Sequence, residues 1–191
     1  MRKSARVTEP PDGFRYQEEV LPPDEESELV ERLRELPLKE FEFHGYVGKR
    51  RTLSYGWHYE FSAERLQQTE EIPEFLHRVR ERAADFAGLT AEDLPHALVT
   101  EYSPGTPIGW HRDKGVFDDV VGISLASPCI FRLRRKTASA WERYSLTLQP
   151  RSAYLLRGDA RTQWEHSILA VETLRYSITF RSLRAARRES K

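Results

Sequence analysis

Two histidines and one aspartate in this chain have the types and spacing of a metal-binding set. His111 and Asp113 are separated by one residue, and His166 follows much later in the chain. In an extended segment, residues i and i+2 point to the same side, so His111 and Asp113 can reach one ion while Arg112 points away. Two imidazoles and one carboxylate hold Fe(II) on one face and leave three positions open for a co-substrate and oxygen. A hydrolytic zinc site with three protein ligands and a water is the alternative metal centre.

A pair of arginines favours iron over zinc. Arg175 and Arg181 are six residues apart in a strand-like run, which places them on the same face of a strand. Their forked guanidinium groups match the two carboxylates of a dicarboxylic acid. An arginine inside a buried strand is costly unless it meets an anion, and an Asp or Glu of the chain itself is the alternative partner. A zinc hydrolase would have no use for such a pair.

From about Gly45 to Arg181, the chain resembles the AlkB-type Fe(II)/2-oxoglutarate dioxygenases. Besides the residues above, the resemblance rests on Tyr102, which stands nine residues before His111. It implies that His111, Asp113 and His166 are the catalytic metal ligands, with Fe(II), 2-oxoglutarate and O2 as cofactors. The residues that it implies for binding 2-oxoglutarate are Tyr102, Thr100 (where the family often has Asn), Arg175, Ser177, Thr179 and Arg181. In this scheme Arg175 and Tyr102 hold the distal carboxylate, and Arg181 lies near the keto-acid end.

Residues 49–62 are similar to the segment that grips nucleic acid in the duplex-repairing members of this family. Tyr59 and Phe61 match two aromatic residues that clamp a flipped base there, and with Tyr55 they alternate along one expected strand face. Simple sheet packing is the other interpretation of these aromatics. Two arginines just upstream would contact phosphates. The residues expected to bind substrate are therefore Arg50, Arg51, Tyr55, Tyr59 and Phe61. Gly115 stands where some members have an acidic residue against the base, so the resemblance does not imply a base preference.

The activity implied by the resemblance is oxidative demethylation of alkylated DNA or RNA bases, a DNA alkylation repair reaction that releases succinate, CO2 and formaldehyde. The same chemistry on a protein side chain or a small molecule, and a non-catalytic nucleic-acid-binding module, are the alternatives. They stay open because the formal net charge is +0 and the pI is about 7.0, so the chain as a whole does not attract nucleic acid. Basic residues are concentrated in three short segments, at 49–51, 132–136 and 184–188.

The elements that must position these residues are ordered with helices first and strands later. Apolar residues at helical spacing, bounded by prolines or glycine, predict helices within 22–36 and 73–87. Alternating residues predict strands at 40–46 and 51–61. Further strands are expected at 97–102, 120–125, 129–133, 144–148, 153–157 and 174–180. We therefore predict an α+β, mainly β fold, a double-stranded β-helix (jelly roll) core buttressed by two N-terminal helices. The AlkB-type resemblance implies the same core.

With 191 residues, a single domain is expected. The predicted organisation is a disordered leader at 1–20, a single AlkB-like dioxygenase domain at 21–183 and a basic tail at 184–191. Within the domain, 40–65 is the substrate-recognition segment and 95–183 is the jelly-roll catalytic core. The single cysteine, Cys129, excludes an intrachain disulfide and fits a cytoplasmic protein. No apolar run approaches the length of a membrane span, and we expect a monomer.

Overall fold

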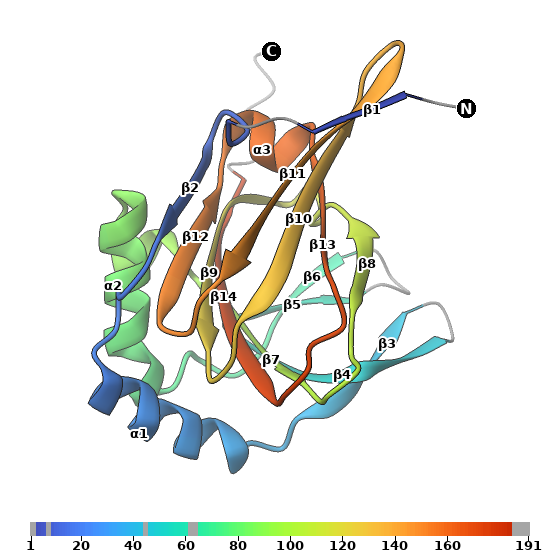
Figure 1. The fold of residues 1–191 in the computed structure, drawn as a ribbon. Coiled ribbons are helices and arrows are strands. Elements are labelled where there is room, and N and C mark those ends of the chain that lie inside the picture. Colours follow the sequence, from blue (N-terminus) through green and yellow to red (C-terminus); the bar gives the residue numbers. More distant parts are fainter. Residues whose placement is uncertain (1–2, 7–8, 44–45, 61–64, 185–191) are drawn as a thin grey trace, which may run out of the picture.

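Two facing β-sheets form the core of the protein (Figure 1). The computed structural model describes residues 3–6, 9–43, 46–60 and 65–184. The larger sheet has the order β2 (Phe14–Gln17), β12 (Ser152–Leu156), β9 (Phe117–Leu125), β14 (Arg175–Leu183), β7 (His96–Tyr102), β4 (Tyr46–Tyr55), β3 (Lys39–Phe43). The smaller sheet has the order β1 (Lys3–Arg6), β11 (Ala140–Leu148), β10 (Cys129–Lys136), β13 (Glu165–Ile168), β8 (Ile108–His111). The predicted mainly β, jelly-roll class is confirmed.

The strands of the larger sheet have one apolar face and one polar face. On β14, Tyr176, Ile178 and Phe180 are buried in an apolar cluster with helical residues. The alternate residues, from Arg175 to Arg181, are polar and lie on the opposite face. That second face lies toward the smaller sheet, whose Phe131 and Leu133 share a core cluster with Tyr102 and Tyr154 of the larger sheet. The polar side chains of β14, from Arg175 to Arg181, therefore lie between the two sheets.

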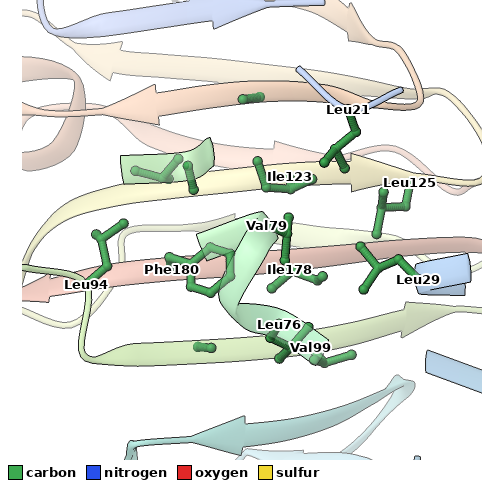
Figure 2. Packing of buried hydrophobic residues seen from close by; sticks show 14 of the residues in the cluster. Leu21, Leu29, Leu76, Val79, Leu94, Val99, Ile123, Leu125, Ile178 and Phe180 are labelled. Atoms are coloured by element: carbon green, nitrogen blue, oxygen red, sulfur yellow. The ribbon is translucent and has the colours of Figure 1, made fainter. Parts of the chain in front are cut away.

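Helices cover the apolar face of the larger sheet (Figure 1). They are α1 (Pro23–Arg34), the short η1 (Glu74–Leu76) that leads into α2 (His77–Ala87), and η2 (Ala91–Asp93), while α3 (Gly158–Thr162) lies after β12. Figure 2 shows Val79 of α2 packed over Ile123 and Ile178 of the sheet, and Leu29 of α1 beside Leu125. Each buried aliphatic side chain of this kind contributes about 1.5–3 kcal/mol, so this layer fixes the position of β9 and β14.

The expected disordered leader is corrected by the structure. β1 pairs with β11, and β2 pairs with β12 at the edge of the larger sheet. Phe14 of β2 is buried, and its ring stacks on Phe131 at a centroid distance of 6.1 Å. The polar N-terminal residues and the prolines at 10 and 11 indicated disorder, but one buried aromatic and a free sheet edge order the segment at β2. The expected basic tail lies outside the described residues apart from Arg184.

The strand expected at 51–61 is in fact two strands. Gly56 separates β4 from β5 (Trp57–Glu60), which pairs with β6 (Arg65–Gln68) in a small sheet of its own. Gly56 has a φ of 72°, and a Cβ at this position would lie 1.9 Å from the carbonyl oxygen of Pro95. The glycine therefore turns the chain where another residue would not fit. In the described part of the chain, no helix has the length and apolar character needed to cross a membrane.

Candidate functional site

The three candidate metal ligands lie together where β8 and β13 pair. His111 is the register partner of His166, and their ring centroids are 4.2 Å apart. Asp113 lies just beyond the end of β8, and its Oδ2 atom is 3.6 Å from Nε2 of His166. Nδ1 of His111 is 2.9 Å from the carbonyl oxygen of Gly109, which leaves Nε2 of His111 for a ligand role. The tertiary structure thus brings together residues that are far apart in the chain.

The donor set and its spacing fit a divalent ion. Two ligand atoms at 2.0–2.2 Å from one ion lie roughly 2.8–3.6 Å apart at octahedral or tetrahedral angles, so the 3.6 Å between Asp113 Oδ2 and His166 Nε2 is at the upper end of that range. Among the described residues, no group of three or more His, Cys, Asp or Glu side chains is placed so that it could hold a metal ion. The assignment of His111, Asp113 and His166 therefore rests on their proximity and chemistry.

Arg181 fixes the orientation of the Asp113 carboxylate. Its Nε and Nη2 atoms donate to Oδ1 of Asp113 at 3.0 and 2.7 Å. This leaves Oδ2 directed toward His166 as the available ligand atom. Two nitrogen atoms of the guanidinium are thus engaged by a carboxylate of the chain itself, and the expected place of Arg181 near the keto-acid end of 2-oxoglutarate stays a prediction. For Arg181, the anionic partner is therefore an acidic residue of the chain itself, which was the alternative to a bound dicarboxylic acid.

The protonation states at this site are those that bind a metal. Burial and the neighbouring His111 lower the pKa of His166 to about 3, against the opposing charge of Asp113. Burial by itself would raise the pKa of Asp113, but Arg181, His166 and His111 together hold it below its ordinary value. At neutral pH, His166 is therefore a neutral imidazole and Asp113 is a carboxylate, as metal coordination requires.

Arg175 is the strongest candidate for binding an anion. It is fully buried on β14, its Nη2 donates to Oγ of Ser124 at 3.1 Å, and its guanidinium lies 4.7 Å from the ring centroid of Tyr102. Among the described residues, its Nε and Nη1 atoms have no hydrogen-bond partner. A buried cation with unsatisfied donors is costly, so this arrangement calls for a carboxylate from outside the chain.

The neighbouring predicted co-substrate residues lie on the same sheet face as Arg175. Tyr102 is the register partner of Arg175, and its hydroxyl is 3.4 Å from Oγ of Ser177. Thr100 is the register partner of Ser177, and both are buried. Thr179 follows Ser177 on the same face of β14. A small polar surface thus surrounds the buried guanidinium, and its contact with 2-oxoglutarate stays a prediction.

Two of the expected substrate-binding residues lie on the wrong face of the larger sheet. Tyr55 is 5% exposed and belongs to the apolar cluster under the helices. Arg51 forms a two-point ion pair with Glu101 at 2.8 and 2.9 Å, and the Glu101 carboxylate also accepts from the Tyr176 hydroxyl. Because Tyr176 faces the helices, this pair is on the face away from the metal ligands. Tyr55 and Arg51 are therefore removed from the predicted substrate site.

Tyr59 remains beside the candidate metal ligands. It is partly exposed on β5, and Nζ of Lys114 lies 5.1 Å from its ring centroid. Lys114 directly follows Asp113, so Tyr59 lies near the end of β8 where the ligands converge. Because Gly56 ends β4, Tyr55 and Tyr59 do not share one strand face as expected. Phe61 lies outside the described residues.

Arg50 lies on the polar face of the larger sheet rather than on an open surface. Extending the register between β4 and β7 by one residue from the Arg51–Glu101 pair places Arg50 beside Tyr102. Its guanidinium is half-buried, 3.8 Å from the ring centroid of Phe41. Burial lowers its pKa, and Tyr102 opposes that effect. The expected contact with an exposed phosphate is therefore corrected to a position next to the co-substrate residues.

Three supporting residues were missed by the sequence analysis. Ser124 holds Arg175, and His96 accepts from Nη1 of Arg181 at 3.4 Å. Arg161 is buried, and its Nη2 donates to the carbonyl oxygens of Lys114 and Phe117, which anchors the turn after Asp113. Each lies in an ordinary strand or turn context in the sequence. Their partners follow from strand register and from the docking of α3, and no local sequence pattern indicates them.

The chain matches the model of the 2OG-Fe(II) oxygenase superfamily over residues 13–181. Among curated proteins, it is 30% identical over 146 residues to the "Alkylated DNA repair protein ALKBH8 homolog" of Arabidopsis thaliana, covering 64% of this chain and 42% of that protein. It is 36% identical over 111 residues to the mitochondrial "Alpha-ketoglutarate-dependent dioxygenase alkB homolog 7" of Bos taurus, covering 57% and 48% of the two chains. The chain thus spans less than half the length of these two relatives.

A solved structure has the same fold. The structure titled "The structure of OsALKBH1" superposes with a TM-score of 0.71 at 16% sequence identity. The superposition covers 89% of this chain and 96% of the other. At this identity, the likeness supports the arrangement of sheets and helices and nothing finer.

Proposed function

This chain belongs to the 2OG-Fe(II) oxygenase superfamily as a dioxygenase of the AlkB type, and we propose that it removes alkyl groups oxidatively from nucleobases in DNA or RNA. Its cofactors are Fe(II), 2-oxoglutarate and O2. When bound, they supply the oxidation of an N-alkyl carbon, coupled to loss of CO2 from 2-oxoglutarate and formation of succinate. The hydroxylated N-methyl product then loses formaldehyde and leaves the restored base.

The residues of the chain have separate tasks in this proposal. His111, Asp113 and His166 hold the metal, and Arg181 keeps one oxygen of Asp113 directed toward it. Arg175 binds the distal carboxylate of 2-oxoglutarate through Nε and Nη1, which have no hydrogen-bond partner among the described residues. Burial of this face excludes water, which strengthens the ion pair between Arg175 and the co-substrate.

The position of Tyr59 is the observation that supports a nucleobase as substrate. Its partly exposed ring lies against Lys114, next to Asp113. A planar base extruded from its stack can lie against such a ring, and enzymes that act on a base must extrude it. The cation of Lys114 is close enough to meet the phosphate beside that base. The name of the Arabidopsis thaliana relative, which refers to alkylated DNA repair, points the same way.

A panel of substrates tests this proposal. The enzyme with Fe(II), 2-oxoglutarate and O2 is incubated with N-methylated single-stranded DNA, duplex DNA, RNA and methylated peptides, and formaldehyde and succinate are both measured. We expect formaldehyde in a 1:1 ratio to succinate with at least one oligonucleotide and none with peptides. Coupled turnover with peptides alone would transfer the same chemistry to a protein side chain. Tyr59→Ala should lose the oligonucleotide activity and keep the slow succinate formation that needs no substrate.

A further inference from the structure

Tyr154 reaches into the co-substrate region over a glycine. It belongs to β12, is 7% exposed, and is the register partner of Gly122 on β9. A Cβ atom on Gly122 would lie 2.2, 2.3 and 2.6 Å from Cε1, Cζ and Oη of Tyr154. Such distances are impossible between real atoms, so the missing side chain at Gly122 is what lets the phenol lie across β9.

Crossing β9 brings the hydroxyl toward β14. Thr179 is the partner of Gly122 on that strand, between Arg175 and Arg181 on the same face. Burial raises the pKa of Tyr154 above its ordinary value, and so do Tyr102 and Asp113, against the opposing effect of the two arginines. The phenol is therefore a protonated donor close to both the metal ligands and the anion-binding guanidinium. It makes no hydrogen bond with any residue that the structure describes.

We propose that Tyr154 is a further binding residue for the co-substrate, and that its hydroxyl donates a hydrogen bond to 2-oxoglutarate between Arg175 and the metal. The proposal rests on the assignment of the polar surface around Arg175 to 2-oxoglutarate. It adds a donor from β12, on the far side of β9 from the arginine strand. The dicarboxylate is then held from two sides, and Gly122 is required because any side chain there would displace the phenol.

An anaerobic titration of the Fe(II) protein with 2-oxoglutarate, followed by the visible absorption of the chelate, tests this role without turnover. Tyr154→Phe should weaken 2-oxoglutarate binding roughly tenfold, as expected for a hydrogen bond to a charged group. Tyr16→Phe is the matched control, because Tyr16 is the register partner of Tyr154 on β2 and its hydroxyl already accepts from the backbone N–H of Gln149. Its affinity should equal that of the wild type.

Gly122→Ala provides an independent test, since the added methyl group must push the phenol away and should weaken binding at least as much as Tyr154→Phe. Arg175→Lys separates two kinds of failure. If Arg175→Lys weakens binding and Tyr154→Phe does not, the role of Tyr154 is wrong and the site stands. If neither changes the affinity, the site itself is wrong.

A different observation concerns the outer face of the smaller sheet. The guanidinium of Arg134 lies 4.4 and 4.5 Å from the ring centroids of Trp110 and Trp141, and that of Arg132 lies 4.7 Å from Trp110. Arg134 is also the register partner of Arg143, so two cations stand directly opposite each other. The outer ladder, as we name Trp110, Arg132, Arg134, Trp141 and Arg143, is therefore both basic and aromatic.

The charge of the outer ladder is balanced in part. Glu165 pairs with Arg134 at 2.6 Å, whereas Arg132 donates to the neutral hydroxyl of Ser167. Burial lowers the pKa of Arg132, and the like charges of Arg134 and Arg143 add to this effect. Three cations and one anion leave a net positive face on which two indole rings are partly exposed.

We infer that the outer ladder binds the backbone of a single-stranded nucleic acid, with bases stacked on the two tryptophans. Cations that follow the phosphates and aromatic rings that take bases are the combination used for this ligand. Trp110 directly precedes His111 on the edge strand β8, so a strand whose alkylated base occupies the metal site can continue over that edge. This inference extends the proposed nucleic-acid substrate to a longer contact.

Binding of unmodified oligonucleotides, measured by fluorescence anisotropy, tests this surface independently of demethylation. For a twelve-nucleotide strand, the double variant Arg132→Gln/Arg134→Gln should weaken binding at least tenfold. The slope of log K against log salt concentration should become shallower by about 1.4, or about 0.7 for each lost phosphate contact. Trp141→Ala should weaken it roughly fivefold or more. Arg15→Gln is the control, since Arg15 is an exposed arginine over a different ring, that of Phe86. Equal affinities for all four proteins, or no binding by the wild type, would overturn the inference.

Discussion

Replacing Arg175 by methionine is expected to leave the ligand-free protein about as stable as the wild type or more stable, although the residue is fully buried. The reason is that the Arg175 guanidinium is buried with only part of its hydrogen-bonding capacity used. Its Nε and Nη1 atoms have no hydrogen-bond partner among the described residues, and its charge has no carboxylate beside it. Methionine has a similar length and no polar atom, so it fills the same space without a desolvated charge.

The expected change can be estimated from the contacts. Two unsatisfied buried donors cost about 1–3 kcal/mol each. Their removal is offset by loss of the Ser124 hydrogen bond, worth about 1 kcal/mol, and of the contact with the Tyr102 ring, worth about 1–2 kcal/mol. The free energy of unfolding should therefore change by between about −1 and about +4 kcal/mol, with the middle of the range on the stabilised side. At a concentration of 100 times its Kd, 2-oxoglutarate should stabilise the wild type by about 2.7 kcal/mol and the variant by much less.

Urea unfolding with Mn(II), with and without 2-oxoglutarate, measures both effects. Arg157→Met is the matched control, because Arg157 makes a two-point ion pair with Asp119 at 2.9 and 2.6 Å. That variant should lose stability, since Asp119 is left unpaired, and should keep the full stabilisation by 2-oxoglutarate. If Arg175→Met lowers the stability by more than about 3 kcal/mol or retains the ligand effect, the interpretation of Arg175 as an anion site is refuted.

Three further outcomes follow from the same structure. His111→Ala should abolish succinate formation while circular dichroism shows an intact fold, and full activity would remove His111 from the metal site. Arg51→Gln should lower the free energy of unfolding by about 1–3 kcal/mol, because Glu101 loses its two-point partner, with no change in 2-oxoglutarate affinity; an altered affinity would contradict its place under the helices. Burial and a neighbouring arginine hold the pKa of His96 well below its ordinary value of 6.5, so only the unfolded chain takes up this proton. As the pH falls below about 6.5, this site should therefore reduce stability by up to about 1.4 kcal/mol per pH unit. In the variant His96→Asn, the free energy of unfolding should fall less steeply than in the wild type as the pH is lowered. An identical pH profile of the two proteins would show that His96 is protonated in the folded protein.

Local spacing, together with the family resemblance, was sufficient to select the residues that the structure brings together at the candidate site. His111 and Asp113 point the same way because they are separated by one residue at the end of a strand, and Arg175 and Arg181 share a face for the same reason. The mainly β fold followed from short alternating runs separated by turns. These features depend on residues close together in the chain, whose relative geometry is set by the backbone period.

The errors arose where the relation between distant segments decides the outcome. Tyr55 and Tyr59 alternate in the sequence, yet the turn at Gly56 places them in different sheets. Arg51 is adjacent to Arg50 in the chain, but the pairing of β4 with β7 sets it opposite Glu101 on the helix face. Which face of a strand is buried depends on what packs against it, and this is a property of the folded chain.

The sequence by itself therefore determined the ligand types, the paired arginines and the class of fold. Only the tertiary structure decided that Arg181 clamps Asp113 while Arg175 is left with unsatisfied donors. Both are arginines on one strand face, and nothing local distinguishes them. The difference comes from neighbouring strands: β14 runs past Asp113 and the other candidate metal ligands at one end and past Tyr102 and Ser124 at the other. A negative charge of the chain meets the first guanidinium, and the second is left for a ligand.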